Sequence, residues 1–260
     1  KKIVSFNILD DSFGILIMSV ERMENFNLKS LYTTGLTIAI DSLREKRMNK
    51  ITELLTFTDP DIICLQEVNL KILEKLKNKL NMKGFNRYSI NKTKDTYKRK
   101  INNKFQTFER DQYRVIFHKE AKVDFVNNIH QFVSGEIMLE GKSLTFIVYN
   151  NSLIISAHFS WRLALNDKRK EVTNVKIIGN FLTSCIEVVK KLSVFNINNI
   201  IIVGDTNNIK DSLEDIIGKA KSNHSLNITF RVYDSPVPTF FRDLNGGQSI
   251  DNLISITINK

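Results

Sequence analysis

The segment that most constrains this chain runs from Asn199 to Asn207, with the sequence Asn-Ile-Ile-Ile-Val-Gly-Asp-Thr-Asn. Its four consecutive β-branched residues predict a short, buried strand. Apolar sequence then gives way to Asp205 and Asn207, whose oxygen-bearing side chains are two residues apart. A strand that ends here would deliver both side chains to the rim of a sheet, where a hard cation or a phosphate can bind. The same residues also suit an ordinary turn after a strand, so other segments are needed to distinguish the two interpretations.

Length and composition favour a single domain with a basic surface. With 260 residues, 42% of them hydrophobic, the chain can bury one large core, and we expect one catalytic domain over residues 1–260. The formal net charge of +10 favours a polyanionic partner such as nucleic acid or an anionic membrane surface, although the abundant Lys, Asn and Ile can also reflect coding bias. No apolar run approaches the length that spans a bilayer, so no transmembrane segment is expected. Cys64 and Cys185 lie in apolar segments and are expected to be buried free thiols, which indicates an intracellular protein, cytoplasmic or nuclear.

Strand and helix patterns alternate along the chain, which predicts a layered α/β domain. Residues 10–40 are expected to form a long loop with one short helical piece, and Asn150-Asn151-Ser152 is typical of a hairpin turn. The predicted strands cover residues 3–9, 61–67, 113–118, 144–149, 153–158, 200–203, 228–232 and 248–256. The predicted helices cover residues 43–55, 70–80, 166–192 and 211–217.

Residues 91–112 lack any periodic pattern and are predicted to be an exposed loop. The first ten of these residues carry five cations and one aromatic side chain. One interpretation is a solvated surface loop that is simply charged. The other is a substrate contact, in which Lys98 and Arg99 meet phosphates and Tyr97 stacks on a base.

Polar side chains stand at or beside the ends of five apolar segments, where ligand sites of α/β sheets form. With few thiols and one histidine, the set suits Mg²⁺ or Mn²⁺ better than zinc. Each residue also has a structural interpretation: Glu67 could cap the following helix, His158 could be a core histidine, and Asp251 could pair with a lysine. The residues concerned are Asn7, Glu67, His158, Asp205, Asn207 and Asp251.

In this order the residues resemble the endonuclease/exonuclease/phosphatase superfamily of Mg²⁺-dependent phosphodiesterases. The combination of Leu-Gln-Glu after a buried strand with a later Gly-Asp-x-Asn is specific. The resemblance implies a DNase-I-like, four-layer α/β sandwich, with two packed mixed β-sheets flanked by helices. It also implies a nuclease that hydrolyses phosphodiester bonds in nucleic acid. The matching pieces are Phe6-Asn7-Ile8-Leu9, Leu65-Gln66-Glu67-Val68, Ser156-Ala157-His158, Gly204-Asp205-Thr206-Asn207 and Ser249-Ile250-Asp251-Asn252-Leu253.

The resemblance also implies a role for each polar residue. Glu67 would ligate Mg²⁺ with Asn7 beside it, and His158 would stabilise charge on the phosphoryl oxygens. Asp205 would position or deprotonate the attacking water, and Asn207 would orient that group and the phosphate. Asp251 would orient a second histidine from a Ser-Asp-His motif. No Ser-Asp-His occurs in these residues, so we expect it beyond Lys260; the other explanation is a pseudoenzyme.

The branch of the superfamily stays open at this point. The Asn-x-Leu opening and the segment that leads into Asp61-Ile62-Ile63-Cys64-Leu65-Gln66-Glu67 look like the deadenylase and nocturnin branch, which suggests a 3′ exonuclease. Gly-Asp-Thr-Asn followed by Asp211 looks more like the tyrosyl-DNA phosphodiesterase branch. Trp161 and Arg162 follow His158 and are candidates for substrate contact by stacking or phosphate pairing. The alternatives are an inositol-phosphate or lipid phosphodiesterase, and a catalytically dead module that binds nucleic acid.

Overall fold

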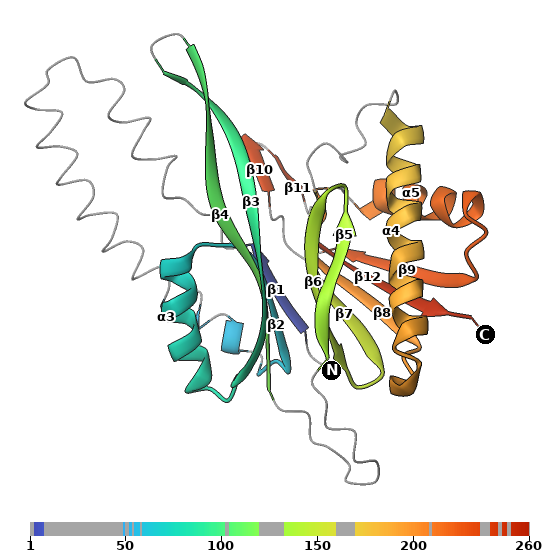
Figure 1. The fold of residues 1–260 in the computed structure, drawn as a ribbon, viewed down its shortest axis with the longest axis horizontal. Helices are drawn as coiled ribbons and strands as arrows, with labels where there is room; N and C mark the ends of the chain where they lie inside the picture. The colour runs from blue at the N-terminus through green and yellow to red at the C-terminus, as the bar shows by residue number, and fades with distance from the viewer. Residues whose placement is uncertain are drawn as a thin grey trace, which may run out of the picture.

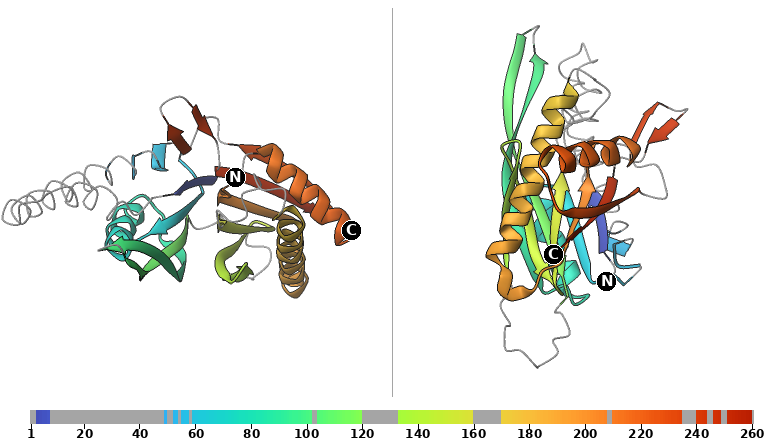
Figure 2. Two further views of the ribbon diagram at one scale, coloured as in Figure 1. Left: turned by 90° about the horizontal axis from the view of Figure 1, so that it is seen from above. Right: turned by 90° about the vertical axis from the view of Figure 1, so that its right-hand side faces the viewer.

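The computed structural model describes residues 3–7, 49, 52–53, 55–57, 59–101, 104–119, 133–159, 170–207, 210–234, 240–243, 246–248 and 251–259. Two sheets pack face to face, and helices cover their outer faces (Figure 1). Seen from above, the layers run in the order helix, sheet, sheet, helices (Figure 2). This architecture confirms the four-layer α/β sandwich that the resemblance implies.

The first sheet has the strand order β1-β2-β4-β3. Its members are β1 (Ile3–Asn7), β2 (Ile62–Val68), β4 (Lys104–His118) and β3 (Arg87–Ile101). β1 and β2 are parallel, whereas β4 runs antiparallel to both of its neighbours. Helix α3 (Leu70–Asn81) covers the outer face. Because side chains alternate along β2, Ile63 and Leu65 pack with α3, and Ile62 and Cys64 pack toward the second sheet.

The second sheet has six strands in the order β5-β6-β7-β8-β12-β9. They are β5 (Ser134–Leu139), β6 (Lys142–Tyr149), β7 (Ser152–His158), β8 (Asn199–Asp205), β12 (Asp251–Ile258) and β9 (Ile228–Asp234). Helices α4 (Glu171–Lys191) and α5 (Lys210–Asn223) cover its outer face. β10 (Phe240–Asp243) and β11 (Gly246–Gln248) form a separate pair.

Strand β8 is central and buried on both faces, as its unbroken apolar run predicts. Ile200 and Ile202 pack with the helices, while Ile201 and Val203 pack toward the first sheet. Since β7 and β8 are parallel, the segment that connects them must cross one face of the sheet, and this segment contains α4. By length and composition, α4 is the one helix within the described ranges that could cross a membrane. Its apolar side is a core face here, with Val175, Ile178 and other residues buried against the sheet.

The hairpin predicted at Asn150-Asn151 is confirmed, and both residues have positive φ angles of 44° and 60°, as a type I′ turn requires. The loop predicted for residues 91–112 is wrong. Apart from residues 102–103, which lie outside the described ranges, this segment belongs to a long antiparallel hairpin of β3 and β4. Helix α5 also extends beyond the predicted residue 217, and β5 was not predicted at all. Residues 8–48, and with them the predicted loop at 10–40, lie outside the described residues.

Candidate active site

Glu67 lies near the end of β2, where the strand is irregular. The pairing of β2 with β4 shifts between Leu65 and Val68, and Glu67 adopts a positive φ of 52°. Such a backbone conformation is uncommon outside glycine and re-aims the side chain that carries it. Glu67 does not cap the following helix, because the Asn69 side chain accepts the Ile72 N–H at 2.9 Å instead. The structural interpretation of Glu67 as a helix cap is therefore wrong.

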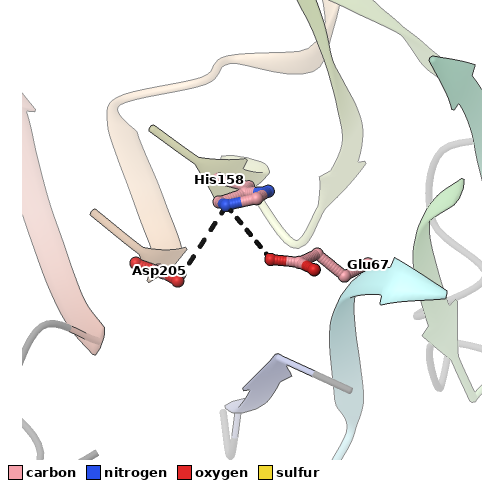
Figure 3. A group of neighbouring side chains, drawn as sticks. All are labelled: Glu67, His158 and Asp205. Carbon is pink, nitrogen blue, oxygen red and sulfur yellow. Dashed lines mark ion pairs between the residues drawn. The ribbon is translucent and has the colours of Figure 1, made fainter. Parts of the chain in front are cut away.

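His158 and Asp205 end two neighbouring parallel strands, and they are direct partners in the register of β7 and β8. His158 Nε2 lies 3.4 Å from Glu67 Oε1 and 4.0 Å from Asp205 Oδ2 (Figure 3). One ligand atom from each of the three side chains lies within 4.8 Å of the others. Residues separated by up to 138 positions thus meet at one edge where the two sheets face each other.

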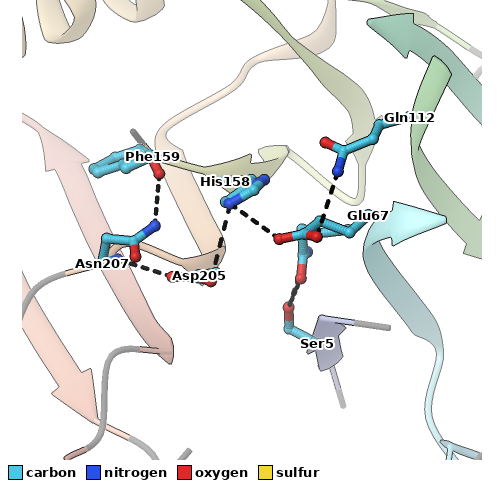
Figure 4. A network of polar contacts seen from close by, with 8 residues as sticks. Ser5, Glu67, Gln112, His158, Phe159, Asp205 and Asn207 are labelled. Atoms are coloured by element: carbon cyan, nitrogen blue, oxygen red, sulfur yellow. Dashed lines mark hydrogen bonds and ion pairs between the residues drawn. The ribbon is translucent and has the colours of Figure 1, made fainter. Parts of the chain in front are cut away.

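Each carboxylate has one oxygen held by the protein, and its other oxygen faces His158 (Figure 4). The Gln112 side-chain amide donates to Glu67 Oε2 at 3.3 Å. The Asn207 backbone N–H donates to Asp205 Oδ1 at 2.9 Å. These two hydrogen bonds fix the orientation of the Glu67 and Asp205 carboxylates relative to each other and to His158.

Asn207 itself is anchored to the loop after β7. It has a positive φ of 54°, and its side-chain amide donates to the Phe159 carbonyl at 2.7 Å. The Phe159 N–H in turn donates to the Asp205 carbonyl at 2.8 Å. These bonds connect the ends of β7 and β8, so the positions of His158, Asp205 and Asn207 depend on one another.

Next to the site, a group of polar side chains, Ser5, Gln66 and Ser156, connects the two sheets. The buried Gln66 side-chain amide donates to Ser5 Oγ at 3.1 Å and to Ser156 Oγ at 3.0 Å. Gly204 lies against the Gln66 side chain and has a φ of +139°. A Cβ at this position would lie 2.2 Å from the Ala157 carbonyl oxygen. The glycine of the Gly-Asp-Thr-Asn motif is therefore required by packing and by backbone conformation.

Two further predicted site residues, Asn7 and Asp251, are located by the backbone pairing of their strands. The backbone of Asn7 pairs with Gln66, beside Glu67, and the backbone of Asp251 pairs with Asp205. Both residues thus reach the same edge, and the roles of their side chains stay predictions. Lys98 and Arg99 lie on β3, and Trp161 and Arg162 lie outside the described residues.

The sequence prediction missed a second set of polar residues, on β3 and β4. Gln112, Arg114 and Asn91 are buried, with at most 4% of their surface exposed. Arg114 donates to the Ser143 carbonyl at 2.5 Å, and the Asn91 side-chain amide donates to Ser143 Oγ at 2.5 Å. The available signal was the alternation of Gln112 and Arg114 with Tyr113 and Val115, which continues the strand pattern of residues 113–118 toward the N-terminus.

The donor set fits a hard divalent cation. Two carboxylates converge with a single imidazole and no thiol, which favours Mg²⁺ or Mn²⁺ over a softer metal. Of the histidines in the described ranges, His158 alone belongs to this cluster: His118 contacts the Lys119 carbonyl beside Tyr149, and the His224 ring packs over Gly179 of α4. His224 is therefore no substitute for a second histidine at the site.

No protein-family model matches the sequence, and no curated protein matches it. Solved structures are similar in fold. The endonuclease/exonuclease/phosphatase family protein from Leptotrichia buccalis C-1013-b has a TM-score of 0.52 at 11% identity, covering 98% of this chain and 86% of that one. Humanized D. rerio TDP2 has a TM-score of 0.47 at 12% identity, covering 100% and 84%. An endonuclease/exonuclease/phosphatase from Bacteroides vulgatus has a TM-score of 0.46 at 14% identity, covering 82% and 79%. The first likeness supports the DNase-I-like sandwich, and at these identities none of the three determines an activity.

Proposed function

We propose that this protein is a divalent-metal-dependent hydrolase of phosphodiester bonds in nucleic acid. The observation that carries the proposal is the convergence of Glu67, His158 and Asp205 within 4.8 Å at the shared end of strands from two sheets. The DNase-I-like fold, the net charge of +10 and the order of the motifs support it. The buried free thiols support an intracellular location, cytoplasmic or nuclear, as part of the same proposal.

Each residue of the site would have a different role in hydrolysis. Glu67 would hold Mg²⁺ or Mn²⁺ together with Asn7, and the cation would neutralise charge that develops on the transferred phosphoryl group. Asp205 Oδ1 accepts from the Asn207 N–H and Oδ2 faces His158 within the site, so Oδ2 would orient the attacking water and accept its proton. His158, which lies next to both carboxylates, would donate a hydrogen bond to a phosphoryl oxygen. The Asn207 side chain, whose amide donates to the Phe159 carbonyl, would orient the bound phosphate.

The test is hydrolysis by purified protein, with Mg²⁺ or with EDTA, over a panel of substrates. The panel contains poly(A), single- and double-stranded DNA, abasic DNA, a tyrosyl-linked oligonucleotide and an inositol polyphosphate. We expect metal-dependent cleavage of at least one nucleic acid. Poly(A) as the preferred substrate would favour a deadenylase, and the tyrosyl-linked oligonucleotide would favour the tyrosyl-DNA phosphodiesterase branch. Cleavage of the inositol polyphosphate alone would replace this proposal with the lipid or inositol-phosphate alternative.

Matched variants identify the site. Glu67→Gln and Asp205→Asn keep side-chain size and remove charge, and each is expected to lower the rate at least about 100-fold. His158→Gln is expected to do the same, whereas His224→Gln, on the outer helices, should leave the rate unchanged. Far-UV circular dichroism checks that each variant is folded. Unchanged hydrolysis by both carboxylate variants would refute the site, and binding of nucleic acid without any turnover by the parent protein would favour the binding module.

A further inference from the structure

The hairpin of β3 and β4 continues past the end of β2, on the side where Glu67 lies. The pairing of β2 with β4 stops at Val68 and Tyr113, but β4 extends from Gln112 back to Lys104, paired throughout with β3. At about 3.3 Å per residue, these nine residues reach about 30 Å beyond the part of β4 that pairs with β2. Figure 1 and the right-hand view of Figure 2 show the hairpin projecting from the body of the protein. Its root is part of the site, because Gln112 donates to Glu67.

Charge is distributed unevenly along this hairpin. In the inner part, cations face acids across the strands: Lys92 Nζ lies 2.7 Å from an Asp111 oxygen, and Lys94 Nζ lies 3.4 Å from a Glu109 oxygen. The outer part, which we define as Tyr97–Ile101 paired with Lys104–Phe108, contains four cations, three aromatic residues and no acid. The cations of the outer part are Lys98, Arg99, Lys100 and Lys104. The sequence of the outer part therefore gives it a formal charge of +4.

We propose that the outer part of this hairpin is a nucleic-acid-binding arm, which contacts the phosphodiester backbone outside the scissile bond. The proposal rests on the proposed function and specifies where the polymer runs after it leaves the site. A linear polyanion whose phosphate lies at Glu67 and Asp205 would pass along a basic ribbon rooted beside Glu67. Tyr97, Phe105 and Phe108 add the aromatic component that single strands use for stacking, and a two-stranded ribbon also fits the major groove of a duplex.

Two double variants with the same change in charge test the arm. Lys98→Gln/Arg99→Gln removes two cations from the outer part, and Lys92→Gln/Lys94→Gln removes two ion-paired cations from the inner part. Binding is measured in EDTA by fluorescence anisotropy, with labelled single- and double-stranded oligonucleotides of about 20 nucleotides, whose repeat of about 3.4 Å covers the arm. The outer variant is expected to bind at least about 10-fold more weakly at low salt. The slope of log K against log salt should fall by about 1.4 for a single strand, or about 1.8 for a duplex, as two phosphate contacts are lost.

The inner variant should change affinity less than about twofold, since its lysines already face acids. Equal losses in the two variants would overturn the proposal, because net charge alone would then explain binding. It would also be overturned if the outer variant lost affinity for anionic phospholipid vesicles and kept its affinity for both oligonucleotides. Hydrogen exchange of the unmodified protein gives an independent measurement, in which the oligonucleotide should slow exchange over residues 95–110, and unchanged exchange there would contradict the arm.

Binding in EDTA does not depend on turnover, so the two proposals fail separately. A protein that binds through the hairpin and hydrolyses nothing would refute the proposed function and leave the arm in place. If the parent protein hydrolyses nucleic acid, but the outer variant binds nucleic acid as tightly as the parent does, only the arm would be refuted.

Discussion

At the scale of single residues, Gln112 decides how Glu67 is presented. Its buried amide holds Glu67 Oε2, while the positive φ of Glu67 turns the side chain out of the regular strand. Gln112→Met keeps the length of the side chain and removes the donor, so the carboxylate loses its fixed orientation. Affinity for Mn²⁺, measured by isothermal titration calorimetry, is expected to fall about 10- to 100-fold.

The matched control for Gln112→Met is Ser89→Ala. Ser89 is also a buried polar residue of the first sheet, and its hydroxyl lies 2.8 Å from Thr145 Oγ1 of the second sheet. This variant weakens contact between the sheets without touching Glu67, so its Mn²⁺ affinity should equal that of the parent. Equal Mn²⁺ affinity in Gln112→Met and the parent would show that Glu67 is oriented without Gln112.

Gly204 is a second residue on which the site depends, through the backbone. Gly204→Ala would place a Cβ 2.2 Å from the Ala157 carbonyl oxygen and 2.8 Å from Gln66 Nε2, at a φ of +139°. Since the nearest obstacle is backbone, β7 and β8 would have to separate, and the free energy of unfolding should fall by about 3 kcal/mol or more. Urea denaturation measures this change. The control is Gly218→Ala in α5, where a Cβ meets no atom within 4 Å; it should leave the free energy of unfolding unchanged or raise it by up to about 1 kcal/mol. The same result for Gly204→Ala would contradict the close approach of Gly204 to the Ala157 carbonyl.

At the scale of elements, the sequence predicts those strands and helices that bury an apolar face. The hydrophobic pattern of the sequence predicts the strands β2, β7 and β8 and the helices α3 and α4. The ends of the three strands place Glu67, His158 and Asp205 at one edge. The β3–β4 hairpin does not, for two physical reasons. Near the body, its inward residues Asn91 and Gln112 are polar because they meet polar groups of the other sheet or the site. Farther out, the described side chains Thr107 and Glu109 are exposed, so no buried face there imposes an alternation of apolar and polar residues. The support that Gln112 gives to Glu67 was missed because Gln112 is one of the polar inward residues, which leave no hydrophobic pattern.

At the scale of the whole molecule, two buried thiols report on different layers of the sandwich. Cys64 belongs to the core between the two sheets, and Cys185 belongs to the core between the second sheet and its helices. Both are fully buried free cysteines, and burial raises the pKa of each thiol far above its ordinary value. The native state therefore keeps two protons that the unfolded chain releases in mildly alkaline solution.

The sign of the resulting pH dependence follows from proton binding. Above an ordinary thiol pKa of about 8.5, the unfolded chain binds fewer protons than the native state, so the free energy of unfolding falls as pH rises. Each thiol contributes about 2 kcal/mol to this loss by about pH 10, and the two together about 4 kcal/mol. Tyr149, whose pKa is raised by burial and then by Asp61, acts in the same direction at higher pH. Urea denaturation at about pH 8 and about pH 10 should show the full loss in the parent protein and a loss smaller by about 4 kcal/mol in Cys64→Val/Cys185→Ala. An equal loss in both proteins would mean that neither thiol is protected from ionisation in the native state, so that water reaches both cores, which the packing of the four layers excludes.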